Sequence, residues 1–317
     1  MRALITGAGG FVGPHLADHL RASGDDVVPI DVDNGPDLRD RLGWADTVAG
    51  VGPDVIYHLA GWSDVGGSWQ DPFTTFEVNV MGAISVLEAA RLAGTGRVVL
   101  VSSADVYGTV GAEDLPITEQ HPVRPRSPYG ASKEATEAAA AQYHRGHGLD
   151  VVVVRPFNHI GPGQSPRFAA PAFACQIAEA EASDSGDPVP LRHGDLSPER
   201  DLTDVRDVVR AYRLLAETGE AGQTYNVCSG RAVAMHTVLD TLLALSPAPI
   251  RPEVDPARLR PVEVPALRGS PDKLAEATGW APGIELDQTL REVLDDARNR
   301  VGGGTEPPLP TGRPSAG

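Results

Sequence analysis

Short apolar runs alternate with helix-like segments over the first half of the chain. In the segment FVGPHLADHL, apolar positions recur at helical spacing, and further helices are predicted near 72–93 and 129–147. Runs rich in Val, Ile and Leu predict buried strands at 2–6, 26–32, 54–61, 97–103 and 150–156. This alternation predicts an α/β fold with a Rossmann-type, doubly wound parallel sheet.

The pattern changes after residue 156, where Gly and Pro become frequent and strand signals become short. Helices are predicted near 171–183, 204–218, 234–245 and 285–300. We therefore expect one α/β domain at 1–156, to which about 204–228 returns, and a smaller α/β domain formed mainly by 157–301. The tail 302–317 lacks apolar periodicity and is predicted to be disordered.

A glycine-rich turn, TGAGGFVG, joins the first predicted strand to the first predicted helix. Gly7, Gly10 and Gly13 would let the backbone turn tightly and approach a pyrophosphate, which would then lie at the helix N-terminus. A plain strand–helix turn would also explain these glycines, but their place in the first strand–helix unit favours a dinucleotide site.

Asp31 ends the second predicted strand, where a carboxylate accepts hydrogen bonds from a ribose 2′-OH and repels a 2′-phosphate. This favours NAD(H), with NADP(H) as the alternative; a simple strand-end role for the aspartate is the competing interpretation. Further candidate cofactor contacts are Asp37 and Leu38 beside the adenine, and Leu59, Ala60 and Gly61 after the third strand.

Three polar side chains suggest a site for hydride transfer. Tyr129 and Lys133 lie four residues apart on a predicted helix, so they share a face, and a nearby ammonium favours the phenolate form of a tyrosine. Ser103 lies at the carboxyl end of a predicted parallel strand, where ligands bind in open α/β sheets. Ser103 and Tyr129 could therefore bracket a substrate carbonyl oxygen, with Tyr129 as the general acid–base.

Composition narrows the classes of partner. The formal charge of −16 argues against nucleic-acid binding, because phosphate contacts need an excess of Lys and Arg. The two cysteines, Cys175 and Cys228, form neither a disulfide framework nor a metal-ligand pattern, and no metal site is predicted. No signal peptide or membrane-spanning run is visible, so we expect a cytoplasmic protein with no membrane contact.

The motifs TGAGGFVG, SSADVYG and YGASK resemble those of the extended short-chain dehydrogenases/reductases that act on nucleotide sugars. The similarity runs from residue 2 to about 300. The stretches RPFNHIGPGQSP, RDLTDVRDVVRAY and YNVCSG most resemble one branch of that family, the GDP-4-keto-6-deoxy-D-mannose reductases.

The resemblance implies an NAD(P) site and a homodimer formed through a four-helix interface, here the helices near 72–93 and 129–147. It assigns Lys133 to the nicotinamide ribose as well as to the tuning of Tyr129. The other cofactor-binding residues that it implies, beyond the glycines and those named above, are Phe11, Val12, Asn79, Ser102 and Pro156.

The resemblance also implies a GDP-sugar substrate. Asn158 would donate its amide to the diphosphate or the sugar, and Arg200 and Arg260 would bind the diphosphate. Glu263 occupies the place of a guanine-reading glutamate, since one carboxylate can accept both N1–H and N2–H of guanine. A solvated surface charge is the alternative for either arginine, and a salt bridge at a domain interface is the alternative for Glu263.

The residues after Ser103 bear on the type of reaction. Related dehydratases carry a glutamate two residues after the catalytic Ser or Thr, and this chain has the shorter Asp105, preceded by Ala104. Ser-Ala-Asp suits a ketone reductase better than a 4,6-dehydratase, with Asp105 as a secondary group near C5–C6 of the sugar. An NAD-dependent 4-epimerase is the main alternative, and a non-catalytic NAD-binding regulatory protein is the alternative from another class.

Overall fold

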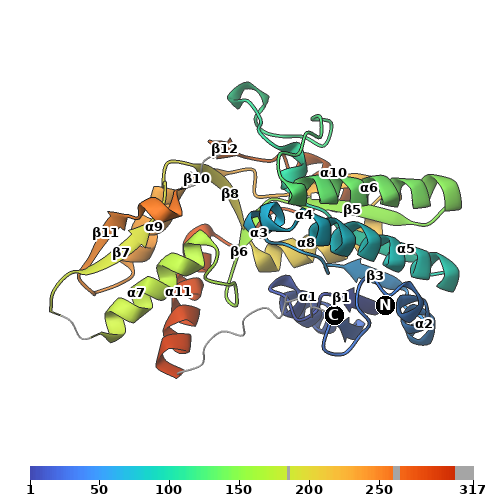
Figure 1. Ribbon diagram of the computed structural model, residues 1–317, viewed down its shortest axis with the longest axis horizontal. Helices are drawn as coiled ribbons and strands as arrows, with labels where there is room; N and C mark the ends of the chain where they lie inside the picture. The colour runs from blue at the N-terminus through green and yellow to red at the C-terminus, as the bar shows by residue number, and fades with distance from the viewer. Residues whose placement is uncertain (184–185, 260–264, 304–317) are drawn as a thin grey trace. The chain divides into compact units, whose positions relative to one another are not determined.

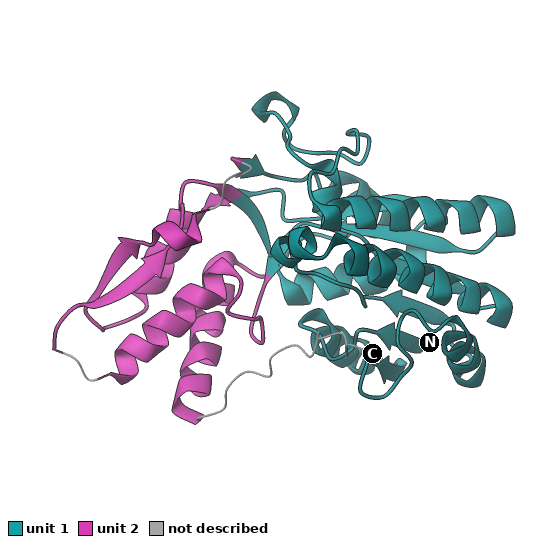
Figure 2. Cartoon of the chain, in the orientation of Figure 1, with its two compact units in different colours: residues 1–159, 200–232, 266–283 teal, residues 160–199, 233–265, 284–317 magenta. Residues whose placement is uncertain are grey.

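The computed structural model describes residues 1–183, 186–259 and 265–303, and the chain divides into two compact units (Figure 2). The first unit contains Met1–His159, Arg200–Ala232 and Ala266–Gly283, and the second contains Ile160–Glu199, Val233–Pro265 and Ile284–Gly317. The segment 266–283 therefore belongs to the first unit, whereas the sequence predicts it to be part of the smaller domain.

A six-stranded parallel sheet forms the centre of the first unit, in the order β2-β1-β3-β4-β5-β9 (Figure 1). Its strands are β1 (Arg2–Thr6), β2 (Asp26–Ile30), β3 (Val55–His58), β4 (Arg97–Val101), β5 (Val151–Pro156) and β9 (Thr224–Val227). The order reverses direction at β1, as in doubly wound sheets. The predicted fold class is confirmed.

Helices cover the sheet on its two faces. Alternate residues of each strand point to opposite faces, so Ala3 and Ile5 pack in one core and Leu4 packs in the other. The first core includes α1 (Val12–Ala22) and α8 (Val205–Thr218), and the second includes α2 (Arg41–Val51), α5 (Gly82–Ala93) and α6 (Pro128–His147). The Val- and Ile-rich runs reflect burial on both faces.

The predicted helix at 72–93 is divided in the structure. It consists of α4 (Pro72–Phe76), the π-helix η1 (Glu77–Met81) and α5, and it follows a short helix α3 (Val65–Gln70). Asp71 caps α4 by accepting a hydrogen bond from the Thr74 N–H at 3.0 Å. The wider π turn matters for the site described below, because it carries Asn79.

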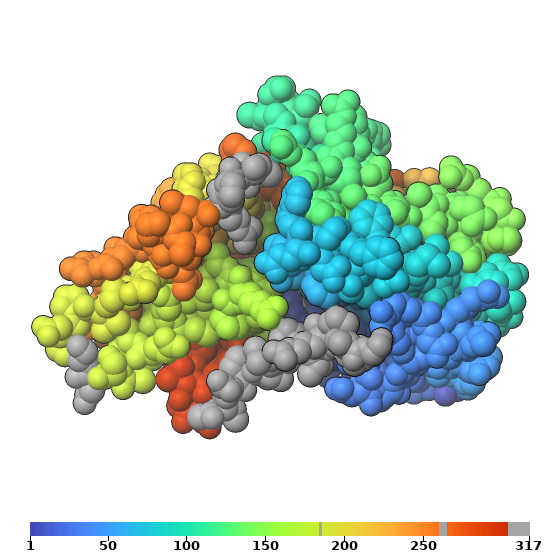
Figure 3. Space-filling model, in the orientation of Figure 1, coloured from blue at the N-terminus to red at the C-terminus, as the bar shows by residue number. Residues whose placement is uncertain are grey.

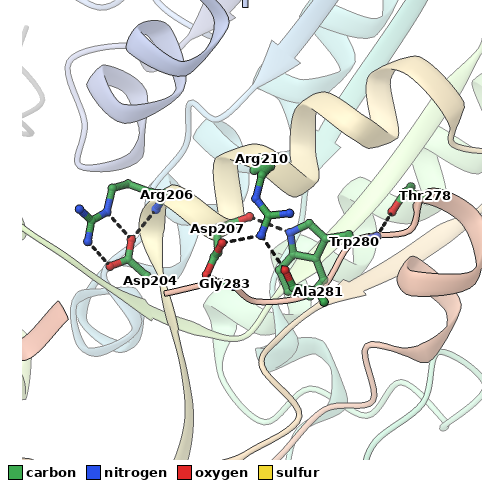
Figure 4. Close-up of polar contacts among 8 residues, drawn as sticks. All are labelled: Asp204, Arg206, Asp207, Arg210, Thr278, Trp280, Ala281 and Gly283. Atoms are coloured by element: carbon green, nitrogen blue, oxygen red, sulfur yellow. Dashed lines mark hydrogen bonds and ion pairs between the residues drawn. The ribbon is translucent and has the colours of Figure 1, made fainter. Parts of the chain in front are cut away.

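The segment 266–283 joins the first unit through contacts with α8 (Figure 4). It includes β12 (Ala266–Leu267) and α10 (Asp272–Thr278). The buried Asp207 accepts hydrogen bonds from Arg210 at 2.5 Å and from the Gly283 N–H at 2.8 Å, and its carbonyl accepts from the Trp280 indole at 3.0 Å. At the start of α8, Asp204 and Arg206 form a two-point ion pair.

The second unit has its own helical core, in which α7 (Ala169–Ala182), α9 (Met235–Ala244) and α11 (Leu286–Gly303) pack together. Two parallel strands, β7 (Val189–His193) and β11 (Ile250–Val254), pair beside them. The remaining short strands, β6 (Asn158–Ile160), β8 (Glu199–Asp204) and β10 (Ala232–Ala234), belong with β12 to one further sheet. Residues 302 and 303 end α11, in place of the start of the predicted tail.

Short 3₁₀ helices complete the structure at η2 (Ala104–Tyr107), η3 (Ala112–Asp114) and η4 (Pro256–Arg258). The helix η2 follows β4 and contains the residues directly after Ser103.

Candidate active site

The glycine-rich turn lies between β1 and α1, where the sequence predicts it. Gly7 has a φ of 73°, and a Cβ on it would lie 2.7 Å from Cα of Ala60, so this position needs glycine. A Cβ on Gly13 would collide with the backbone of Ala8. Phe11 precedes the helix, and no side chain caps its first turn, so backbone N–H groups there suit a pyrophosphate. Gly10 and Val12 belong to the same turn, which fits a dinucleotide.

Asp31 follows the end of β2 and reaches this turn. Its carboxylate accepts a hydrogen bond from the Gly9 N–H at 2.6 Å and another from the Val32 N–H at 2.7 Å. The aspartate therefore fixes the glycine turn as well as presenting negative charge at the end of β2. That charge lies where a ribose 2′ substituent is expected in this fold.

The loop after β3 lies against the turn. The N–H groups of Leu59 and Ala60 donate to the backbone and the hydroxyl of Thr6, at 3.2 and 3.3 Å. Gly61 has a φ of 157°, and a Cβ there would lie 2.7 Å from Oδ1 of Asn79. Ala60 and Gly61 have small side chains or none, which leaves room beside the glycine turn for a cofactor.

Asn79 links two elements of the site in the structure, and the cofactor contact that the resemblance implies stays a prediction. Its side chain accepts from the Trp62 N–H at 2.6 Å, and donates to the Trp62 carbonyl at 3.1 Å and to the Ser132 hydroxyl at 2.8 Å. Asn79 thus ties the loop after β3 to helix α6, one residue from Lys133.

Three more predicted cofactor residues lie at other points of the first unit. Asp37 forms a two-point pair with Arg39, at 2.9 and 2.7 Å, and Leu38 packs against Gly82 of α5. Pro156 is the last residue of β5.

Ser103, Asp105 and Tyr129 come together at the end of β4. The Ser103 hydroxyl donates to the Asp105 carboxylate at 3.0 Å and accepts from the Asp105 N–H at 3.1 Å. Tyr129 is buried, and burial together with the Asp105 charge raises its pKa, while its hydrogen bond with Ser103 opposes that rise. Tyr129 is therefore protonated at neutral pH and able to donate a proton.

Lys133 lies one helical turn after Tyr129 and is also buried. Its ammonium donates to the Val101 carbonyl at 2.9 Å. Burial lowers the pKa of Lys133 to about 8, and the nearby Glu137 carboxylate opposes that change. The serine, the tyrosine and the lysine that the sequence singled out are thus neighbours around one strand end.

Sequence reasoning missed a polar network behind these residues. Glu137 accepts from the Ser102 hydroxyl at 2.5 Å and from Arg155 at 2.9 and 2.6 Å. Arg155 also donates to the Tyr107 hydroxyl at 2.9 Å, which in turn donates to Asn226 at 2.7 Å. Ser102 therefore faces Glu137. A signal was present, because Glu137 continues the four-residue spacing of Tyr129 and Lys133.

The predicted substrate residues are only partly described. Asn158 begins β6 and is exposed, and its neighbour His159 stacks on Phe11 with ring centroids 5.9 Å apart. Arg200 lies on β8 and is half-buried. Arg260 and Glu263 lie outside the described residues.

Two further findings concern membrane spans and metal sites within the described ranges. No helix there is both long and apolar enough to cross a membrane. In the same ranges, no three His, Cys, Asp or Glu side chains are grouped in a way that could hold a metal ion.

Comparison with known proteins gives consistent matches over almost the whole chain. A family model described as "GDP-mannose 4,6 dehydratase" matches residues 32–293. The chain is 38% identical over 305 residues to GDP-6-deoxy-D-mannose reductase of Pseudomonas aeruginosa, covering 95% of this chain and 98% of the relative. It is 33% identical to UDP-glucose 4-epimerase of Mycolicibacterium smegmatis, covering 95% of this chain and 99% of the relative.

Solved structures agree. The structure of RMD from Pseudomonas aeruginosa complexed with NADPH matches with a TM-score of 0.86 at 36% identity, covering 95% of this chain and 100% of that chain. UDP-glucose 4-epimerase of Thermus thermophilus, in complex with NAD, matches with a TM-score of 0.82 at 32% identity, covering 94% and 99%. The chain belongs to the GDP-mannose 4,6 dehydratase family, within the extended short-chain dehydrogenases/reductases that comprise nucleotide-sugar reductases, epimerases and dehydratases.

Proposed function

We propose that the protein reduces the C4 ketone of a GDP-4-keto-6-deoxyhexose with NAD(P)H, as a GDP-4-dehydro-6-deoxy-D-mannose reductase does. The observation that carries the proposal is the cluster of Ser103, Tyr129 and Lys133. After Ser103 the chain has Ala104 and Asp105, whereas related dehydratases have the longer glutamate at the second of these positions. The 38% identity to a GDP-6-deoxy-D-mannose reductase supports the same substrate class.

Each residue of the cluster has its own role in the proposed reduction. When bound, the reduced nicotinamide supplies the hydride to the carbonyl carbon. Tyr129, whose pKa is raised, gives the proton to the carbonyl oxygen, and Ser103 orients that oxygen once its hydroxyl rotates away from Asp105. Lys133 carries the positive charge that stabilises the phenolate left on Tyr129 and binds the nicotinamide ribose.

A direct assay tests the reaction. The purified protein would be mixed with NADH or NADPH and freshly prepared GDP-4-keto-6-deoxymannose, and both the absorbance of reduced nicotinamide and the product sugar would be followed. We expect consumption of the cofactor and formation of a GDP-6-deoxyhexose. If the cofactor is not consumed and protein-bound NAD instead interconverts a UDP- or GDP-hexose, the protein is a 4-epimerase.

For the cofactor we propose a preference for NAD(H), supported by the Asp31 carboxylate at the end of β2. The Pseudomonas aeruginosa structure was solved with NADPH, so the preference is a property to measure in this chain. We expect kcat/KM for NADH to exceed that for NADPH about tenfold, and Asp31→Ser to narrow the ratio by removing the charge opposite a 2′-phosphate. An unchanged ratio in the variant would assign the choice to other residues.

For the nucleotide we propose GDP, read by Glu263 and held by Asn158, Arg200 and Arg260. One carboxylate can accept hydrogen bonds from N1–H and N2–H of guanine, whereas uracil has no such pair of donors. Glu263→Gln should therefore weaken GDP binding at least tenfold. The same substitution should leave weak UDP binding unchanged. Calorimetric titration of the two nucleotides measures the difference.

We also propose a homodimer through the face formed by α3, α4 and α5 together with the neighbouring α6. Large apolar side chains are exposed on α3, α4 and η1, just before α5: Trp69 is 64% exposed, Phe73 74% and Met81 53%. The segment 65–93, drawn in cyan, forms a continuous part of the surface in view (Figure 3). Phe73→Glu should convert the dimer to a monomer in sedimentation experiments.

A further inference from the structure

Three polar side chains form a row across the carboxyl ends of neighbouring parallel strands. Val101 of β4 pairs with Val154 of β5, which places Ser102 and Arg155 one step further along, and Arg155 pairs with Asn226 of β9. Ser102, Arg155 and Asn226 are all buried. Such a row of buried polar groups is costly unless each is satisfied.

Helix α6 satisfies two of the three, Ser102 and Arg155, with the same face that carries the active site, whereas Asn226 is bonded to Tyr107. Tyr129, Lys133 and Glu137 are spaced four residues apart on it. Lys133 donates a hydrogen bond to the Val101 carbonyl at 2.9 Å, and Glu137 accepts one from the Ser102 hydroxyl at 2.5 Å. The two residues that precede Ser103 are thus each held by one side chain of α6.

Arg155 fixes Glu137 in turn. It forms two hydrogen bonds to the Glu137 carboxylate, and its guanidinium lies over the Tyr107 ring at 4.8 Å from the centroid. The side chains of Glu137 and Arg155 are only 12% and 7% exposed, so the pair lies in a poorly hydrated environment. In that environment the negative charge of Glu137 acts on nearby charges with little screening.

Besides Arg155, Glu137 acts on the charge of Lys133, which lies one helical turn before it on α6. Of the titratable groups near Lys133, Tyr129 is neutral because its pKa is raised, and His58 is neutral because burial lowers its pKa to about 3. Glu137 from α6 and His58 from β3 interact electrostatically with Lys133, while Asp105 acts on Tyr129 and Arg155 pairs with Glu137. On α6, the carboxylate of Glu137 therefore supplies the compensating charge for Lys133.

We propose that Glu137 is a positioning residue of the reductase site, which fixes the backbone before Ser103 through Ser102 and keeps the positive charge on Lys133. This inference rests on the proposed ketone reduction for its kinetic consequence. Its electrostatic part concerns the protein alone and is measured without substrate.

The lysine content makes that measurement direct, because Lys133 and Lys273 are the only lysines of the sequence. Protein labelled with [ε-¹³C]lysine gives two side-chain signals in NMR, and the conservative Lys273→Arg variant assigns them. The pKa of Lys133 is about 8 in the native chain. Glu137→Gln should lower it by about 1, whereas Glu134→Gln, which removes an exposed carboxylate from the same helix, should leave it unchanged.

A variant of the opposite partner should move the pKa the other way. Arg155→Gln leaves the Glu137 charge to act on Lys133 alone, so the pKa of Lys133 should rise. A merely structural role for the pair predicts loss of stability in both variants and no shifts of opposite sign. Circular dichroism would confirm that each variant folds, and if Arg155→Gln does not fold, Glu137→Gln against Glu134→Gln still decides.

Kinetics test the positioning of Ser103. Ser102→Ala removes one hydroxyl without leaving a buried charge unpaired, and we expect kcat to fall about tenfold while KM for the sugar stays within about twofold. The alkaline limb of kcat/KM should move to lower pH in Glu137→Gln, together with the NMR titration.

An unchanged Lys133 titration in Glu137→Gln would overturn the electrostatic part, and an unchanged kcat in Ser102→Ala would overturn the positioning part. If the native protein does not reduce the keto sugar, the reductase proposal fails. The NMR result then still stands or falls by itself.

Discussion

Two carboxylate–arginine pairs of the first unit are built alike and lie in different surroundings. Glu137 binds Arg155 at 2.6 Å, and Asp207 binds Arg210 at 2.5 Å. Each arginine also lies near an aromatic ring, Tyr107 at 4.8 Å or Trp280 at 5.7 Å. Arg155 is 7% exposed and Arg210 is 35% exposed. The first pair is therefore buried at both partners, and the second at its acid only.

What each carboxylate touches besides its arginine separates the two pairs. Asp207 accepts from the Gly283 N–H and thereby holds the returning segment 266–283 against α8. Glu137 accepts from Ser102, the residue before Ser103. A fully buried ion pair is weak evidence for stability, because desolvation offsets most of the attraction. Removing one partner of such a pair still leaves a charge unpaired and is destabilising. The comparison therefore predicts that damage near Glu137 appears in catalysis as well as in stability, and damage near Asp207 in stability alone.

The largest effect should come from removing the proton donor on the catalytic face of α6. Tyr129→Phe keeps the ring and its packing but removes the hydroxyl that gives the proton. We expect kcat to fall about 10³-fold in the keto-sugar assay, with the free energy of unfolding changed little. A variant that retained more than about a tenth of the activity would contradict the assignment of Tyr129.

The second effect should appear at the other pair. Asp207→Ala leaves the Gly283 N–H without its acceptor and takes the carboxylate away from Arg210, which keeps the Ala281 carbonyl, so the free energy of unfolding should fall by about 2 kcal/mol in urea titrations. The kcat of the folded fraction should stay within about twofold, since Asp207 does not touch the site. A large loss of kcat at unchanged stability would show that the two regions are coupled and would break the comparison.

The third effect is a pH dependence of the catalytic face. Burial lowers the pKa of Lys133 to about 8, so Lys133 loses its proton as the pH rises through that value. We expect kcat/KM to fall about tenfold per pH unit above about 8, because the neutral amine no longer stabilises the phenolate of Tyr129.

Stability should respond in the opposite sense. The unfolded chain keeps Lys133 protonated up to its ordinary pKa of 10.5, so between about 8 and 10.5 it binds more protons than the native state. This group therefore makes the native state more stable as the pH rises over that window. For the kinetic part of this prediction, a profile of kcat/KM that stays flat to pH ~9.5 would contradict the role of Lys133 in stabilising the phenolate of Tyr129.

The sequence predicted those parts of the molecule that depend on local pattern. Strands buried on both faces appear in the sequence as continuous apolar runs. The turn needs glycine at Gly7 and Gly13 because a Cβ there would meet the backbone of Ala60 or Ala8. Ser103, Tyr129 and Lys133 were found because helical spacing and the position at a strand end are visible along one chain.

The parts that were missed depend on contacts between distant segments. The π turn within the predicted helix 72–93 carries Asn79, which binds the loop at Trp62, and no periodicity reveals that contact. The return of 266–283 depends on Asp207 meeting Gly283, 76 residues later. The role of Glu137 depends on Ser102, just after β4, and on Arg155 of β5, which are distant from it in the sequence.

The smallest effect separates Asp105 from its neighbours at the site. Asp105→Asn keeps an oxygen that accepts from the Ser103 hydroxyl, now at 3.0 Å, and removes a charge that raises the pKa of Tyr129. A lower pKa still leaves Tyr129 protonated at neutral pH, so we expect ketone reduction within about threefold of the native rate. Asp105→Ala is the matched variant that also removes the acceptor.

Steady-state kinetics of the two variants decide what Asp105 does. If Asp105→Asn is as damaging as Tyr129→Phe, the carboxylate itself takes part in proton transfer, and the chain would then have the acid that dehydration across C5–C6 requires. If only Asp105→Ala is damaging, the aspartate acts by orienting the Ser103 hydroxyl. That outcome would place Asp105 with Glu137, among the side chains that act on catalysis through a serine at the end of β4.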